Sequence, residues 1–538
     1  MIVPGMDESD TRTLLAGRRD GGVSVDLSER VHQATGGNPL AILELASDLS
    51  VLHSDSPVPV PAALAESFLR RADALGPGPP TLLALAAAAG GDLRVVVRAG
   101  TVLGIDPWGL AALESAGLVS TTTDRVVFTH PMVGSAIHSS LAAPARRAVH
   151  AAIVDALPDA DLERRAWHRA AAALGPDEGA ARAVESVATA SRRCGAYAVA
   201  AAGFERSAAL TEDDPGRAVR LVDGASAAWK AGDGEWSLRL IEMLERLDPV
   251  PAVRTRALAL RGGLAARVGS LEEARELLLR AASESAGSDP EEAIRLVAEA
   301  VNASFYLADG ALAFEAAQLG ERLLETEVDG ASAALGHLAV GMARVLDGRD
   351  GADHIREGVR LFSLVAADPQ TALDSTWVVL GLLWLRESGA TRASLQAVEA
   401  ARAETAVGAL PRLLFHLARD GATTDRWVSA ACEYLESIAL AEEFGHETDE
   451  ATSLAGLAWL EARQGLEEDC RRHAQRAVTV AVPRHINIAC IWARFALGEL
   501  DLASGRMKEA VEGLIDLHAW LDAVGIRDVD VSPAPELV

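Results

Sequence analysis

Residues 492–514, WARFALGELDLASGRMKEAVEGL, decide the fold class of this chain. Gly498 is followed by Gly505 seven residues later and by Ala510 after a further five. Two antiparallel helices pack closely only where small residues face each other, and glycine ends a helix easily because it adopts positive φ without steric cost. The stretch therefore predicts a helical hairpin whose turn lies at Gly505.

Two other windows, residues 454–478 and 258–282, repeat this pattern of small residues. Their matching positions are Ala458, Gly465 and Cys470 in the first, and Gly262, Gly269 and Ala274 in the second. Internal similarity at a spacing of about 34 residues is typical of helical repeats. The pattern resembles a tetratricopeptide (TPR) repeat in which Leu or Ala mostly replaces the usual aromatic residues. A generic alanine-rich helical bundle is the alternative.

Composition supports an all-α fold with more than one domain. The chain has 538 residues, of which 49% are apolar but only 4% are aromatic, and strand-like runs are scarce. A chain of this length exceeds a single core, so we expect several domains or an array of repeats. From residue 144 onward, the expected helices are separated by Gly-Asp, Asp-Pro and Val-Gly breaks.

Charge and motifs exclude several classes of function. The formal net charge of −27 disfavours direct nucleic-acid binding by this chain. The zinc-protease, nucleophile-elbow and phosphate-loop motifs are absent, and neither lysine (Lys230 or Lys508) follows a glycine-rich cradle. We therefore predict no catalytic residues, no metal site and no enzyme activity. Four scattered cysteines and the lack of a signal peptide or an apolar span predict a cytoplasmic protein without membrane contact.

The first 143 residues divide into three segments. Residues 1–50 are expected to form short helices, residues 51–63 a proline-rich linker, and residues 64–143 a winged-helix domain with helices over 65–75, 81–91 and 105–117. The alternating residues 118–130, LVSTTTDRVVFTH, predict the β-wing as a hairpin that turns at residues 121–124. The expected third helix has two acidic residues and no basic residue, so DNA reading by this domain is not expected.

A separate motif lies at residues 34–46, ATGGNPLAILELA. Gly37 can adopt positive φ, Asn38 is a good helix cap, and Pro39 suits the first helical position. Locally, the stretch predicts a well-started helix. His130 is expected to cap the helix after the wing, with Pro131 in its first turn.

Three other histidines, His138, His150 and His168, each lie on an expected helix, where a lone histidine is usually packed or solvated.

Three motifs together resemble the large ATP-binding LuxR-type transcriptional regulators, which are STAND ATPases of the maltose-regulator kind common in actinobacteria. They are TGGNPLAILEL (35–45), GLVSTTTDRVVFTHPMVGSAI (117–137) and RRAVHAAIVDALPDADLERRAWHRAAAALGPDEGAA (146–181). Family members consist of a P-loop core, a helical lid, a winged helix, a TPR-like sensor arm and a helix-turn-helix. The resemblance covers the middle portion: lid remnant, winged helix, and a TPR-like array over 144–538 that looks cut at its C-terminus.

The resemblance implies particular roles for residues and partners. Gly37, Asn38 and Pro39 would lie near the nucleotide, and His130 would sense it; Thr129 and Gly134 stand where the family commonly has arginine. ATP or ADP is expected only in a complete regulator, so this chain needs no cofactor of its own. The concave surface of the array would bind a protein or small-molecule inducer, and oligomerisation is compatible with the array. Two alternatives are a free-standing TPR-like scaffold and, less favoured, an NTPase subunit.

Overall fold

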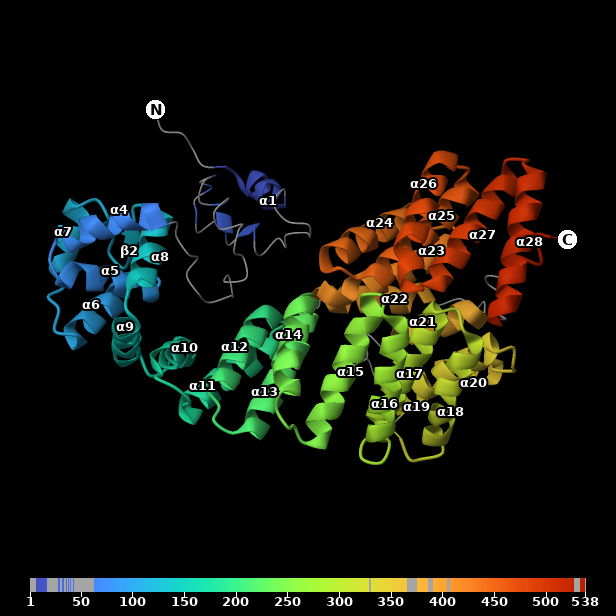
Figure 1. The fold of residues 1–538 in the computed structure, drawn as a ribbon, viewed down its shortest axis with the longest axis horizontal. Coiled ribbons are helices and arrows are strands. Elements are labelled where there is room, and N and C mark those ends of the chain that lie inside the picture. The colour runs from blue at the N-terminus through green and yellow to red at the C-terminus, as the bar shows by residue number, and fades with distance from the viewer. Residues whose placement is uncertain are drawn as a thin grey trace. The chain divides into compact units, whose positions relative to one another are not determined.

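The computed structural model describes residues 6–16, 28–29, 31–32, 35, 37, 39, 42, 62–328, 330–364, 375–385, 390–403, 407–526 and 533–537. It divides into two compact units, the first made of residues 1–193 and 198–224 and the second of residues 194–197 and 225–538. Over the described residues, the fold is helical with one two-stranded sheet (Figure 1). The predicted all-α class is confirmed.

The first unit contains short helices and the β-hairpin. Its elements in chain order are α1 (Glu8–Ala16), α4 (Ala62–Asp73), α5 (Gly78–Ala88), α6 (Leu93–Val102), α7 (Gly109–Ser115), β1 (Val119–Thr121), β2 (Val126–Phe128), α8 (Pro131–Ser140), α9 (Ala143–Ala156), α10 (Leu162–Ala172) and α11 (Glu178–Arg193). Helices α12 (Tyr197–Ala209) and α13 (Asp214–Lys230) follow; most of their residues belong to the first unit, and residues 225–230 of α13 belong to the second. The core between α5, α6, α8 and α9 is built from aliphatic residues such as Leu82, Val96, Ile137 and Ile153, all buried.

The hairpin forms where the alternating pattern predicted it, with its turn one residue later. Thr121 pairs with Val126 in the antiparallel ladder, so the turn consists of residues 122–125. It is closed by the Thr122 amide, which donates to the Arg125 carbonyl at 2.8 Å. The third helix, expected within residues 105–117, begins as α7 at Gly109, and Asp106 accepts a hydrogen bond from the Trp108 amide just before it. The winged-helix label and the domain boundaries remain predictions, and residues 51–61 lie outside the described residues.

The second unit is an array of helical hairpins. The first helices of the pairs, which we call the inner helices, are α15 (Pro251–Arg267), α17 (Pro290–Tyr306), α19 (Gly330–Leu346), α21 (Ser375–Leu385), α23 (Leu410–Thr423), α25 (Glu447–Gln464) and α27 (Asn487–Ala503). Their partners, the outer helices, are α16 (Leu271–Ser285), α18 (Gly310–Leu324), α20 (Ala352–Phe362), α22 (Ala390–Ala403), α24 (Trp427–Phe444), α26 (Glu467–Ala481) and α28 (Met507–Val524). Helix α14 (Gly234–Glu245) precedes the array, and two short 3₁₀ turns, η3 (Val407–Ala409) and η4 (Val482–Arg484), lie within it.

The predicted breaks begin and end these helices for identifiable reasons. Asp233 accepts a hydrogen bond from the Trp236 amide at the start of α14, and Asp289 accepts one from the Glu292 amide at the start of α17. Both are side-chain N-caps, which satisfy amides that have no partner inside the helix. Gly269, Gly465 and Gly505 have φ of 84°, 75° and 73° respectively, as expected for glycine at the end of a helix.

Small residues let the two helices of a hairpin approach, as the repeat predicted. A Cβ added to Gly262 would lie 2.8 Å from Leu278 Cγ, and one added to Gly498 would lie 2.5 Å from Leu514 Cδ2. In both hairpins the leucine lies 16 residues after the glycine. The same packing contact therefore recurs in two repeats, which makes the unit a TPR-like helical solenoid.

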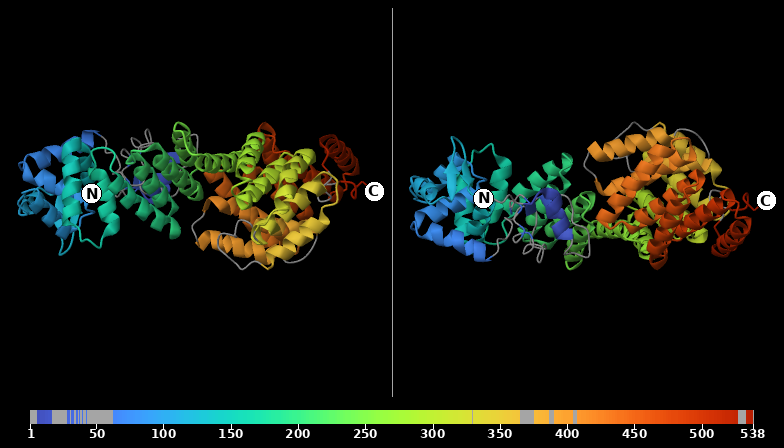
Figure 2. Two further views of the ribbon diagram at one scale, coloured as in Figure 1. Left: turned by 90° about the horizontal axis from the view of Figure 1, so that it is seen from below. Right: turned by 90° about the horizontal axis from the view of Figure 1, so that it is seen from above.

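The inner helices also meet across the array. Helix α15 contacts α25, and α17 contacts α27, so helices early in the array lie beside helices near its end (Figure 2). In α17, 12 residues are buried, compared with 6 in α16, because α17 is covered on more sides. The inner surface of the array is therefore largely filled by side chains.

Candidate functional site

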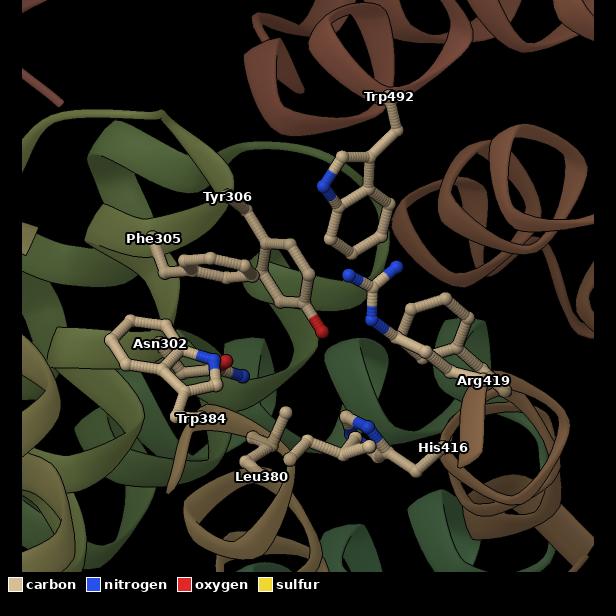
Figure 3. Close-up of a pocket in the computed structure, with 10 residues that line it drawn as sticks. Asn302, Phe305, Tyr306, Leu380, Trp384, His416, Arg419 and Trp492 are labelled. Carbon is tan, nitrogen blue, oxygen red and sulfur yellow. The ribbon is translucent and has the colours of Figure 1, made fainter. Parts of the chain in front are cut away.

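Four inner helices surround a small pocket at the centre of the second unit (Figure 3). Helix α17 contributes Asn302, Phe305 and Tyr306; α21 contributes Leu380, Leu383 and Trp384; α23 contributes Phe415, His416 and Arg419; and α27 contributes Trp492. The sequence predicted a site on the inner surface but no residue for it. Only the tertiary fold brings together side chains that are up to 190 residues apart in sequence.

Aromatic rings form most of the pocket wall. The rings of Phe415 and Trp492 stack with 5.7 Å between their centroids and an interplanar angle of 18°. Phe305 lies 6.1 Å from Trp492 and 6.2 Å from Trp384, with tilted rings. These distances are within the range of favourable aromatic pairs. The wall is therefore suited to a flat, apolar group.

Polar groups also line the pocket (Figure 3). The Arg419 guanidinium carbon lies 4.3 Å from the centroid of the Trp492 ring, within cation–π distance. His416 is 3% exposed, and neither of its ring nitrogens has a hydrogen-bond partner among the described residues. The indole nitrogen of Trp492 is also buried without a partner in that part of the chain. Buried polar atoms are normally hydrogen-bonded, so these atoms mark a place where a ligand or a water can bind.

Burial and nearby positive charge keep His416 neutral. Burial disfavours the imidazolium, and the Arg412 guanidinium repels it, so the pKa of His416 falls to about 3. At neutral pH each ring nitrogen is therefore either a donor or an acceptor, according to the tautomer.

A buried network of ion pairs lies beside the pocket and joins four inner helices. Arg412 on α23 donates to both carboxylate oxygens of Glu299 on α17 at 3.2 Å. Arg267 on α15 donates to Asp449 on α25 at 3.2 Å and lies 3.6 Å from Glu299. Burial alone would raise the pKa of Asp449, but Arg267 and His446 outweigh it and lower that pKa to about 2. The network joins two helices from the early part of the array, α15 and α17, to two later ones, α23 and α25, with opposite charges that compensate each other.

The pocket is small as the structure stands. Its volume is about 10 Å³, enough for a single water molecule. Leu383, Trp384 and Arg419 are each only partly buried, whereas Phe415, Tyr306 and His416 are buried. A larger guest therefore requires these three rim side chains to turn outward.

The residues predicted to lie near a nucleotide are only partly described. Gly37 has a φ of 71° and its carbonyl accepts a hydrogen bond from the Met6 amide at 2.8 Å; a Cβ at this position would overlap the Met6 backbone. Pro39 is exposed, and Asn38 lies outside the described residues. The need for glycine at position 37 is thus explained by packing and φ, and the nucleotide role stays a prediction.

His130 is half-buried and precedes α8. Its ring centroid lies 6.0 Å from that of Phe68, and its carbonyl accepts a hydrogen bond from the Val133 amide at 3.0 Å in the first turn of α8. Its helix-start position agrees with the sequence, and its role as a nucleotide sensor stays a prediction.

His138, His150 and His168 form a chain of ring contacts in the first unit. Nε2 of His138 lies 3.3 Å from Nε2 of His150, and Nδ1 of His150 lies 2.9 Å from Nδ1 of His168. Burial lowers the pKa of all three, to about 3 for His150 and about 4 for His168. Sequence reasoning missed this chain because the three residues lie on different helices, and no local spacing signals their contact.

Neither a metal-binding cluster nor a membrane-spanning helix is present among the described residues. No group of three or more His, Cys, Asp or Glu side chains there is arranged to hold a metal ion. No described helix is long and apolar enough to cross a membrane.

No protein-family model matches this sequence, and no curated protein matches it. Among solved structures, a STAND protein with a tetratricopeptide repeat sensor from Pyrococcus horikoshii is similar at 15% identity, over 89% of this chain and 73% of that chain, with a TM-score of 0.29. A Rap protein in complex with competence and sporulation factor is similar at 11% identity, over 65% of this chain and 89% of that chain, with a TM-score of 0.35.

Proposed function

We propose that this chain is the sensing and protein-interaction portion of a LuxR-type STAND regulator, and that its second unit binds an inducer at the pocket between the inner helices. The observation that carries the proposal is the group of buried polar atoms without partners, in His416 and Trp492, among aromatic side chains from four helices. The motif resemblance supports the regulator context. No catalytic role, metal, nucleic-acid contact or cofactor is assigned to this chain.

A ligand at this pocket has a physical means of altering the array. The pocket is lined by α17, α21, α23 and α27, and two of these helices, α17 and α23, are also joined by the Arg412–Glu299 ion pair. A guest that displaces the rim side chains would shift these helices relative to one another. A ligand changes a conformational equilibrium only by its differential affinity for the two states, and a pocket that must open provides such a difference.

A thermal-shift screen of metabolites and short peptides tests this function. His416→Phe keeps a ring of similar size and removes both nitrogens, and His518→Phe makes the same change at an exposed position on α28. We expect at least one compound to raise the Tm of the wild type and of His518→Phe but not of His416→Phe, with circular dichroism confirming that all three fold. If no compound stabilises the protein, or if all stabilising compounds act equally on the three chains, the pocket is not the site.

A free-standing TPR-like adaptor would use the same pocket without nucleotide control. Titration of the chain with ATP and ADP distinguishes the regulator portion from the NTPase alternative. We expect the regulator portion to bind neither nucleotide, because this chain contains no phosphate-loop motif. Tight binding of either nucleotide would contradict our assignment and would favour the NTPase alternative.

A further inference from the structure

Early and late helices of the array meet in contacts that differ chemically from those between neighbouring hairpins. We call these contacts the seam. Its early side is formed by α15, α16 and α17, and its late side by α23, α25, α27 and the turn before α27. The residues that bond or pair across it are Ala266, Arg267, Glu272, Glu299 and Leu307 on the early side, and Arg412, Thr448, Asp449, His485 and Asn487 on the late side.

Polar contacts hold the seam together. The Thr448 hydroxyl on α25 donates to the Ala266 carbonyl on α15 at 2.7 Å. Asn487 Nδ2 on α27 donates at 2.8 Å to the carbonyl of Leu307, which directly follows α17. The arginine–carboxylate network beside the pocket crosses the seam as well. Because water can replace the partners in such contacts when they separate, each gives the closed seam only a small net stabilisation.

The closed seam also buries polar atoms that it leaves unsatisfied. His446, at the start of α25, is 1% exposed, and neither of its ring nitrogens has a hydrogen-bond partner among the described residues. Its Nδ1 lies 3.6 Å from Oδ2 of Asp449, and that oxygen and Nε of Arg412 are likewise buried without a partner in the described part of the chain. Buried polar atoms of this kind raise the free energy of the closed state, and water would satisfy them in an open one.

Neighbouring hairpins are instead joined by close apolar packing. A Cβ added to Gly320 on α18 would lie 3.2 Å from Val297 Cγ1 on α17 and 3.2 Å from Val340 Cγ2 on α19. Separating such surfaces exposes apolar area to water, which is unfavourable in proportion to that area. We therefore expect the array to separate along the seam more readily than between neighbouring hairpins.

The pocket lies between the two sides of the seam. Phe305 belongs to α17 on the early side and Trp492 to α27 on the late side, and their ring centroids are 6.1 Å apart. Separation of the seam would move these two walls apart. The closed pocket, at about 10 Å³, holds no more than a water molecule, so a larger ligand needs a movement of this kind to enter.

We propose that the array has an open state in which the seam separates while each hairpin stays folded, and that a ligand enters the pocket through this opening. The second part of the inference rests on the proposed function, whereas the first concerns the array alone. Local opening of this kind takes place in cooperative units at a lower free energy than global unfolding.

Two buried hydroxyl residues provide matched thiol probes for the open state. Thr448 and Ser437 are both 0% exposed, and each hydroxyl donates to a main-chain carbonyl at 2.7 Å. The Thr448 bond crosses the seam to Ala266, whereas the Ser437 bond reaches Pro411 inside the hairpin of α23 and α24. Thr448→Cys and Ser437→Cys therefore remove the same kind of bond and differ in which contact must open to expose the thiol.

The test measures the rate at which each thiol reacts with DTNB, after circular dichroism has shown that both variants keep the helical content of the parent chain. Four substitutions remove the native thiols: Cys194→Ser, Cys432→Ser, Cys470→Ala and Cys490→Ala. We expect the thiol of Thr448→Cys to react at least about tenfold faster than that of Ser437→Cys without denaturant. Its rate should also rise less steeply with urea, because opening the seam exposes less surface than unfolding the hairpins.

Equal rates with equal urea dependence, or a faster reaction of the Ser437→Cys thiol, would overturn the open state. The seam would then separate only when the hairpins unfold.

A compound from the thermal-shift screen whose effect depends on His416 tests the entry route. At a free concentration of about ten times its Kd, it should slow the Thr448→Cys reaction about tenfold, because it holds the two pocket walls together. An unchanged rate would overturn entry through the seam and leave the proposed function standing. If the screen yields no such compound, the proposed function and the entry route both fall, and the two thiol rates still decide whether the array opens.

Discussion

Adjacent glycines on α15 provide a direct test of how the helical hairpins pack. Gly262 is buried against α16, where a Cβ would lie 2.8 Å from Leu278 Cγ and 3.1 Å from Leu278 Cδ2. Gly263 is the next residue on the same helix, and a Cβ there would meet nothing within 4 Å. Replacing each by alanine therefore changes the helix propensity equally and changes the packing at only one position.

The expected free energies follow from these two surroundings. Alanine in place of glycine inside a helix stabilises by about 0.5–1 kcal/mol, so Gly263→Ala should raise the free energy of unfolding by roughly that amount. Gly262→Ala gains the same contribution but forces α16 away, and overpacking of a core costs about 1–3 kcal/mol. We therefore expect Gly262→Ala to be less stable than Gly263→Ala by about 1–3 kcal/mol.

Urea denaturation followed by circular dichroism at a helical wavelength measures this difference. A second matched pair, Gly498→Ala and Gly513→Ala, should show the same contrast, with Gly498→Ala the less stable variant. A Cβ at Gly498 would lie 2.5 Å from Leu514 Cδ2, whereas one at Gly513 would meet nothing within 4 Å. Equal stabilisation by all four substitutions would refute the idea that small residues fix the spacing of the hairpins.

Three further predictions concern charge, pH and the N-terminal region. Arg412→Met should lower the free energy of unfolding by about 3 kcal/mol, because it leaves the partly buried Glu299 with Arg267 as its one remaining arginine partner. The double variant Arg412→Met with Glu299→Leu should recover part of that loss in the same urea assay. The pKa of His416 is about 3 in the folded protein and near 6.5 in the unfolded chain, so its contribution to stability is complete above pH 6.5 and is lost as the pH falls toward 3. His416→Phe should therefore reduce the slope of the unfolding free energy against pH in that window by up to about 1.4 kcal/mol per pH unit. Gly37→Ala should make the N-terminal region more sensitive to limited proteolysis, because Gly37 has a positive φ and a Cβ there would overlap the Met6 backbone. Pro39→Ala, at an exposed position, should leave the sensitivity unchanged, and equal protease resistance of the two variants would contradict this prediction.

The local features of the fold could be read from the sequence because each depends on neighbouring residues. The alternation in residues 118–130 predicted a hairpin, and the Gly-Asp and Asp-Pro breaks predicted boundaries between helices. At two of these breaks the structure shows side-chain caps, Asp233 and Asp289. The turn was placed one residue early because Thr121 has as good a turn propensity as its neighbours, and only its pairing with Val126 decides that it belongs to the strand.

The candidate site could not be assigned from the sequence. Its residues come from four helices, and none has a local signal that separates it from ordinary core: Phe415 and Trp492 read as apolar helix positions, and His416 as a lone histidine. The concave surface was expected to bind an inducer or a protein, without any residue assigned to it. In the structure α15 contacts α25, α17 contacts α27, and a small pocket lies between α17, α21, α23 and α27. The curvature that causes this meeting accumulates over many hairpins and cannot be predicted from any one of them.

The sequence by itself determined that this chain folds into helical hairpins, because glycine and alanine at fixed spacing allow close helix contact. Glycine at positive φ follows the first helix in the hairpins of α15, α25 and α27. Only the tertiary structure decided where polar and aromatic side chains converge. Arg412 meets Glu299 across 113 residues, and Arg267 meets Asp449 across 182, because the array curves until its inner helices touch. Long-range electrostatic and packing contacts of this kind depend on the summed geometry of the repeats, which no local pattern encodes.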